Sequence, residues 1–186
     1  MAEQFEFELL FALPEGEHDP FALSDAVFEA GFEDALVGTG IPRLLGVELV
    51  AGGDDAEDVI LAAARALLKH LPAGAQLREV RPDLVSLADV AEKLGVKRQA
   101  LQQRDMPLPS LGGLYRIDEL AAMLFAAMQP EQGRRKPRFD IEPASKWFRA
   151  GSAARQVNAK LTMRELDPRS LELVSSRKAE DRKIAV

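Results

Sequence analysis

Cysteine is absent from this 186-residue sequence, and it holds only two histidines, one tryptophan and one tyrosine. Without cysteine the chain forms no disulfide bond and offers no thiolate to a metal, which favours a reducing compartment such as the cytoplasm. His18 and His70 are isolated from each other and neither has a ligand-spaced partner, so we expect no metal site. We expect no cofactor either, because Gly38-Thr39-Gly40 is too short for a dinucleotide-binding fingerprint.

Long apolar runs are missing as well. No stretch approaches the roughly 20 apolar residues that are needed to cross a bilayer. The first residues, 1–6, are acidic where a secretory signal would be basic, so we expect no membrane role. The composition is 47% hydrophobic and 29% charged, which is typical of a globular protein. The length suits one ordinary domain or two small ones.

Basic residues are scarce at one end of the chain and abundant at the other. Residues 1–80 carry 16 acidic and 4 basic residues, residues 81–128 carry 6 of each, and residues 129–186 carry 14 basic and 8 acidic residues. The overall charge of -6 therefore hides a strong asymmetry. Such asymmetry suggests an acidic module joined to one that faces nucleic acid, although ordinary solvated surfaces produce it about as often.

Residues 1–82 have the pattern of an acidic α+β domain. Large apolar residues recur at every second position from Phe5 to Leu13, with Glu6, Glu8, Leu10 and Ala12 between them, which predicts a half-buried strand. Asp19-Pro20 is a typical helix start and Gly31 a typical helix end. The other expected elements are strands at 35–37 and 44–50 joined by a glycine-rich loop at 38–42, a helix at 59–71 after the acidic run 54–58, and a strand at 76–80. This order predicts a ferredoxin-like βαββαβ domain that folds independently, with both helices on one face of a four-stranded antiparallel sheet.

Residues 83–128 contain two short helical segments joined by a tight turn. Ser86 and Asp89 have the spacing of a capping box, so the first helix should begin at Leu87. Its apolar residues fall at i, i+3, i+4 and i+7 and should form one buried stripe: Leu87, Val90, Ala91 and Leu94. Gly95 supplies the left-handed conformation that ends such a helix.

The second helix of this pair is expected to read DNA. After Val96 it places Ala100 and Leu101 inward. The opposite, exposed face then carries Lys97, Arg98, Gln99, Gln102 and Gln103. Glutamine can bond N6 and N7 of adenine together, arginine can bond O6 and N7 of guanine, and a lysine at the helix start can meet a phosphate.

The spacing of Ala91, Gly95 and Leu101 resembles that of a bacterial helix-turn-helix. The continuation at 106–120 resembles the short wing and the following helix of MerR-type and excisionase-like domains. Residues 5–128 as a whole resemble small bacterial proteins, usually described only as DNA-binding, that place a ferredoxin-like domain before such a helix-turn-helix. The resemblance implies a winged domain with Tyr115 and Arg116 as wing contacts. This sequence departs from the family pattern because residues 106–113 contain no lysine or arginine.

Residues 129–186 are expected to form a basic, partly flexible tail that is helical in places. Prolines and a glycine mark 129–143 as a linker. Its basic cluster suits phosphate contacts and a solvated linker about equally well: Arg134, Arg135, Lys136 and Arg138. Trp147 with Phe148 is more typical of a docking anchor than of a base-stacking platform. Asp167-Pro168 could open a short helix that contains Leu171.

The sequence therefore predicts an α+β chain with a ferredoxin-like domain (1–82), a winged helix-turn-helix (83–128) and a basic tail (129–186). We expect a double-stranded DNA-binding protein rather than an enzyme, most simply a homodimeric transcriptional regulator whose acidic domain or tail also binds protein. The residues expected to contact DNA are Ser86, Lys97, Arg98, Gln99, Gln102, Gln103, Arg104, Tyr115, Arg116, Arg134, Arg135, Lys136 and Arg138. The alternative is a protein adaptor or antitoxin-like partner whose helix-turn-helix and tail bind protein.

Overall fold

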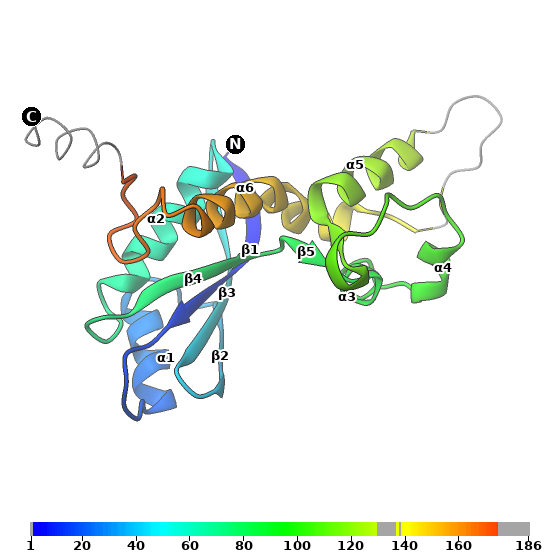
Figure 1. Cartoon of the computed structure of the whole chain (residues 1–186). Coiled ribbons are helices and arrows are strands. Elements are labelled where there is room, and N and C mark those ends of the chain that lie inside the picture. Colours follow the sequence, from blue (N-terminus) through cyan, green and yellow to red (C-terminus); the bar gives the residue numbers. More distant parts are fainter. Residues whose placement is uncertain (1, 130–136, 138, 175–186) are drawn as a thin grey trace, which may run out of the picture.

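A computed structural model describes residues 2–129, 137 and 139–174. This part of the chain is mixed α+β, with a four-stranded antiparallel sheet, a two-stranded sheet and six α-helices arranged as two lobes (Figure 1). The elements are β1 (Glu3–Ala12), α1 (Pro20–Glu29), β2 (Leu36–Ile41), β3 (Leu44–Gly53), α2 (Ala56–Leu68), β4 (Gln76–Arg81), β5 (Leu84–Val85), α3 (Leu87–Lys93), α4 (Arg98–Gln102), β6 (Tyr115–Arg116), α5 (Ile117–Met128) and α6 (Ser145–Thr162).

The larger sheet has the strand order β2-β3-β1-β4. The predicted alternation in β1 is confirmed, because Phe5, Phe7, Leu9 and Phe11 are buried on one face, opposite Leu45, Val47 and Leu49 of β3. Helices α1 and α2 contribute buried side chains to this same core. Glu6 and Glu8 point to the other face of the sheet. Helices α1 and α2 do not cover this face. This second face is called the open face below.

Most of the glycine-rich segment 38–42, for which the sequence predicted a loop, belongs to a strand. Strand β2 continues through Gly38 and Thr39 to Ile41, and Gly38 lies opposite Gly46 of β3. Two glycines face each other here, so the strands pair without any side-chain conflict. The reversal is made instead by Pro42 and Arg43, and Arg43 takes the left-handed conformation (φ 62°) that a tight hairpin demands.

Helix α6 corrects the expectation of a peripheral tail. Its middle is buried in the core over the large sheet through Ala150, Ala153, Ala154 and Val157. Its beginning is buried in the second core, with Trp147 and Phe148 stacked edge to face at 5.4 Å between ring centroids. We expected residues 4–80 to hold a complete core of their own, and the structure adds α6 to that core. Figure 1 shows this helix running from one lobe to the other.

Polar side chains of α6 fix the chain where the two lobes meet. Arg155 contacts Asp83 at 3.1 Å and Asp118, in the first turn of α5, at 3.3 Å. Asn158 accepts a hydrogen bond from the amide of Val80 and donates to its carbonyl, both at 2.8 Å. Asn158 also donates to Asp83 at 2.8 Å. One helix thus anchors the last strand of the sheet, the connection after it and the start of α5.

The residues after α6 form a compact turn rather than the predicted helix. The carboxylate of Asp167 accepts hydrogen bonds from the amides of Arg169 and Ser170, which lower the pKa of Asp167. Leu171 is left-handed (φ 55°) and fully buried, and Leu166 pairs with Leu173. These hydrogen bonds form a turn of the Asx type, and the left-handed Leu171 then reverses the chain where a helix would have continued.

Gly151 sets the distance between α6 and α5. A Cβ atom at this position would lie 2.6 Å from Cγ2 and 2.7 Å from Cγ1 of Ile117. Isoleucine is branched at Cβ and cannot swing these atoms away. The two helices therefore approach as closely as a glycine permits.

Gly151→Ala should lower the stability of the protein. Overpacking costs about 1–3 kcal/mol, and the better helix propensity of alanine returns up to about 1 kcal/mol, so the net change is destabilising. Urea unfolding of the full chain measures the effect. Ser152→Ala is the matched control on the exposed side of the same turn and should not destabilise. Equal stabilisation of both variants would contradict this packing.

Candidate nucleic-acid interface

The predicted helix-turn pair lies in the smaller lobe. The capping box of α3 is confirmed, since the hydroxyl of Ser86 accepts from the amide of Asp89 at 3.2 Å and the carboxylate of Asp89 accepts from the amide of Ser86 at 2.8 Å. The predicted apolar stripe of α3 is buried, and Gly95 is left-handed with φ 64°. The chain therefore turns sharply between α3 and α4.

Helix α4 is short and is held by a single buried side chain. It spans five residues, and Leu101 is fully buried beneath it. The five polar side chains on α4 and at its two caps are all exposed: Lys97, Arg98, Gln99, Gln102 and Gln103. Among the residues that the structure describes, none of them has a hydrogen-bond or ion-pair partner. Helix α4 lies in the part of the smaller lobe that is remote from the large sheet (Figure 1).

A shallow depression of about 430 Å³ adjoins α4 and gathers residues that the sequence named separately. Strands β5 and β6 pair through Leu84 with Arg116 and Val85 with Tyr115, which brings the segments before α3 and before α5 together. The predicted residues that line the depression are Ser86, Arg98, Gln102, Arg104 and Tyr115. Five residues of the expected set thus share one surface.

Three of the expected contacts already have partners within the protein. The Ser86 hydroxyl is the cap of α3. The guanidinium of Arg104 lies over the ring of Phe139, 5.3 Å from its centroid. Arg116 pairs with Glu119 at 3.2 Å. These side chains are oriented by the fold, whereas Arg98 and Gln102 project freely.

The basic cluster expected at Arg134, Arg135, Lys136 and Arg138 lies outside the described residues. The segment that follows α4 is described, and it is apolar where a wing would be basic. Leu108 is 86% exposed and Leu111 is 81% exposed. The absence of lysine and arginine from residues 106–113 thus leaves exposed leucines on the surface that follows α4.

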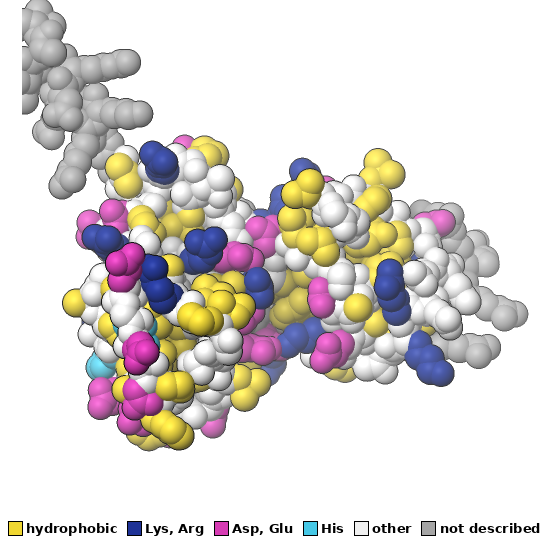
Figure 2. Space-filling model, turned by 60° about the horizontal axis from the view of Figure 1, so that its bottom comes forward, with side chains coloured by type: hydrophobic (Ala, Val, Ile, Leu, Met, Phe, Trp, Pro, Cys, Tyr) yellow, Lys and Arg dark blue, Asp and Glu magenta, His cyan; other side chains and the backbone are white. Residues whose placement is uncertain are grey.

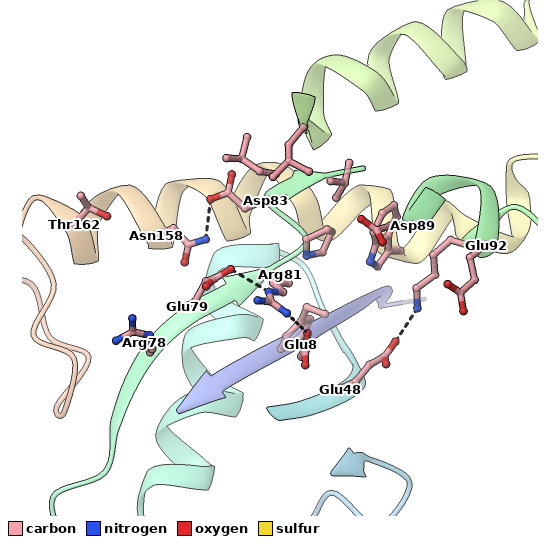
Figure 3. Close-up of a pocket in the computed structure, with 17 residues that line it drawn as sticks. Glu8, Glu48, Arg78, Glu79, Arg81, Asp83, Asp89, Glu92, Asn158 and Thr162 are labelled. Atoms are coloured by element: carbon pink, nitrogen blue, oxygen red, sulfur yellow. Dashed lines mark hydrogen bonds and ion pairs between the residues drawn. The ribbon is translucent and has the colours of Figure 1, made fainter. Parts of the chain in front are cut away.

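A charged cleft of about 1080 Å³ separates the two lobes. In Figure 2 acidic and basic side chains lie close together in the hollow between them. Figure 3 shows that the charged side chains come from the sheet, from the connection after β4 and from α3, while α6 contributes the uncharged Asn158 and Thr162. The charged residues that line the cleft are Glu8, Glu48, Arg78, Glu79, Arg81, Asp83, Asp89, Glu92 and Lys93. Carboxylates outnumber cations here, so the cleft repels phosphate.

Two cations hold the carboxylates of the open face together. Glu8 and Glu48 are direct neighbours across β1 and β3, an arrangement that destabilises a sheet unless cations intervene. The ammonium of Lys93, at the end of α3, pairs with Glu6 and lies 2.7 Å from Glu48. Arg81 pairs with Glu8 at 3.5 Å and with Glu79 at 3.0 Å.

The pKa values of both cations reflect this setting. Burial alone would lower the pKa of Lys93, but hydrogen bonds to Glu48 and Glu6 and their charges raise it above the ordinary lysine value. Burial likewise opposes the charge of Arg81, and Glu79 and Glu8 raise its pKa. The sequence analysis did not identify these pairs, because Lys93 lies 87 residues from Glu6. The only signal was the acidic side of the β1 alternation.

Comparison with family models, curated proteins and solved structures found no match for this chain. In the described part of the chain, no helix is long and apolar enough to span a membrane. The same residues contain no group of three or more histidine, aspartate or glutamate side chains placed to hold a metal ion.

Lys93→Met should loosen the attachment of α3 to the sheet. We expect a loss of about 1 kcal/mol in the free energy of unfolding at low salt, which shrinks as added NaCl screens the pairs. Because the folded-state pKa of Lys93 is raised, its contribution is constant near neutral pH and is lost only in alkaline solution, as pH rises past the lysine pKa. Lys146→Met, at an exposed lysine without a described partner, is the control and should change little. Equal losses at low and high salt would contradict an ion-pair contact.

Proposed function

We propose that this chain binds double-stranded DNA through α4 and acts as a transcriptional regulator. The observation that supports this most strongly is the exposed side of α4, where Lys97, Arg98, Gln99, Gln102 and Gln103 all lack a described partner. Leu101 is fully buried and holds this polar helix to the smaller lobe. A polar, cationic helix face on a buried anchor is what major-groove recognition requires.

The chemistry of α4 assigns a role to each group. Arg98 is proposed to bond O6 and N7 of a guanine, and Gln102 to bond N6 and N7 of an adenine. Lys97 at the helix start would meet a phosphate, which positions the helix without reading sequence. Arg104 and Tyr115 would border the contact, since both line the depression beside α4.

The finer architecture that we propose is a ferredoxin-like domain followed by a winged helix-turn-helix. The strand order β2-β3-β1-β4, with α1 and α2 on one face, supports the first part. The turn at Gly95 between α3 and α4 and the pairing of β5 with β6 support the second. Regulation would consist of occupying an operator in the cytoplasm.

The protein is proposed to act as a homodimer. A helix of five residues contacts too few base pairs to select a site alone, whereas two copies read two half-sites. The acidic sheet lobe would face away from the DNA, because its carboxylates repel phosphates.

One observation favours a second function, a protein adaptor. Leu108 and Leu111 are among the most exposed apolar side chains described, and they belong to the segment that follows α4. Apolar side chains at such a position suit a protein surface better than a phosphate backbone. Salt dependence separates the two functions, because phosphate contacts release counterions and produce a steep salt slope.

Alanine substitution on α4 tests the DNA-binding proposal. The preferred site is first selected from random double-stranded DNA with the full chain. Arg98→Ala and Gln102→Ala should each weaken binding to that site by about 1–3 kcal/mol and relax the preference at one base pair. Lys97→Ala should weaken binding to all sequences alike and reduce the salt slope by about one unit. Titration by fluorescence anisotropy at several salt concentrations measures both effects.

Two control variants distinguish a loss of DNA recognition from a loss of protein stability. Lys146→Ala removes an exposed cation on α6 and should leave affinity unchanged. Leu101→Ala empties the anchor of α4 and should cost about 2–5 kcal/mol of stability, whereas the surface variants should not. If Arg98→Ala and Gln102→Ala bind the selected DNA as tightly as the wild type and with the same preference, α4 is not the reader and the adaptor function is favoured.

A further inference from the structure

The two edges of the large sheet are treated differently by the rest of the chain. Strand β4 forms one edge, and its outer side is covered. Asn158 bonds both the amide and the carbonyl of Val80, and the carbonyl of Pro168 accepts from the amide of Leu77 at 2.8 Å. The segment from α6 to Pro168 therefore satisfies backbone groups that would otherwise be open to another strand.

Strand β2 forms the other edge and has no such cover. Its ladder runs to β3 alone, and none of the other described residues hydrogen-bonds to its backbone. The sequence of β2, Leu36–Ile41, contains no charged residue and no proline. Proteins keep edge strands from pairing with lysine, proline, a β-bulge or a covering segment. This edge carries a bulge between Gly38 and Ile41, but it has neither lysine nor proline, and no described segment covers it.

A β-bulge gives the edge an apolar side. Leu36 lies opposite Glu48, whereas Ile41 lies opposite Leu44, and the register shifts between Gly38 and Ile41. Glu48 and Leu44 are four residues apart on β3 and so share the open face. Without the extra residue of the bulge, Leu36 and Ile41 would point to opposite faces. Instead both lie on the open face, where they are 69% and 61% exposed.

We propose that β2 pairs antiparallel with β2 of a second copy of this chain, which joins two sheets into one of eight strands. In a two-fold antiparallel pair, the start of each strand lies beside the end of the other. Leu36 of each copy then lies near Ile41 of the other, and the exposed side chains cover each other. Asp34 of each copy lies near Arg43 of the other. Within one chain Arg43 pairs with Glu15 at 3.8 Å and donates to the carbonyl of Leu13 at 3.3 Å, so the contact with Asp34 supplements the apolar match.

A second copy fits this edge better than an unrelated strand. When two identical β2 strands pair antiparallel, Leu36 meets Ile41 and Asp34 meets Arg43 at both ends of the interface. Helix α4 lies in the other lobe, away from β2 (Figure 1), so the pairing leaves both α4 helices free. The need for two such helices rests on the proposed function, but the uncovered edge and its pattern do not.

Oligomeric state in solution tests the interface without DNA. Light scattering after gel filtration should give twice the chain mass of 20.4 kDa for the wild type. Leu36→Lys combined with Ile41→Lys places four cations at the two-fold interface and should yield the monomer mass. Phe21→Lys is the matched control, because Phe21 is an equally apolar and 81% exposed side chain on α1, and it should remain dimeric. Circular dichroism of each variant reports whether it is folded.

Hydrogen exchange provides a second measurement that needs no variant. The β2 amides should exchange more slowly in concentrated protein than in dilute protein, while the amides of α1 should not change. A wild type that is monomeric at every concentration, or a dimer whose β2 amides show no concentration-dependent protection, would overturn the interface. DNA binding is scored separately: a dimer protected at β2 that binds no DNA refutes the proposed function alone, and a monomer that binds DNA refutes this interface alone.

Discussion

The shared use of α6 is the constraint on which the rest of the structure depends. Most helices of small proteins bury one stripe in one core, but α6 buries Trp147 and Phe148 in one lobe and Ala154 and Val157 in the other. A helix is stiff over this length, so the two cores cannot rotate independently while both ends stay buried. The ion pairs of Arg155 and the close approach at Gly151 act at the crossing between them. Helix α6 therefore fixes the position of α4 relative to the large sheet.

The cleft between the lobes follows from the same constraint. Once α6 fixes the spacing, the open face of the sheet and α3 must lie near each other with charged groups between them. Lys93 lies between the carboxylates of Glu6 and Glu48, and Arg81 lies between those of Glu8 and Glu79. Four carboxylates of the sheet are therefore paired with cations of the chain itself.

Much of the local structure could be predicted from the sequence, because it is encoded by neighbouring residues. The alternation from Phe5 to Phe11, the caps at Asp19 and Ser86 and the left-handed Gly95 all act within a few positions, and each is present. The features that could not be predicted depend on residues that are distant in the sequence. No local pattern indicates the pair of Lys93 with Glu6, and Gly38-Thr39-Gly40 looks like a loop until Gly46 is placed opposite it.

For α6 a signal was present in the sequence: Trp147, Ala150, Ala154 and Val157 recur at helical spacing. The small size of the alanines concealed it, since a buried stripe is usually recognised by large side chains. The surface of α4 was correctly anticipated as exposed, while the fixed positions of Arg104 and Arg116 depended on Phe139 and Glu119, which only the fold brings near.

The order in which α6 and the sheet occur along the chain has a consequence for biosynthesis. A ribosome delivers the strands and α2 first, and a nascent chain that has reached Met128 already contains the whole large sheet and α4. It still lacks Ala150, Ala154 and Leu171, which close the apolar layer over β1 and β4. The edge of β4 is also bare at that stage, because Asn158 and Pro168 have not yet been made. The N-terminal lobe must therefore wait for nearly the entire polypeptide before it reaches its final form, and during that interval it presents two unpaired strand edges that a chaperone can occupy.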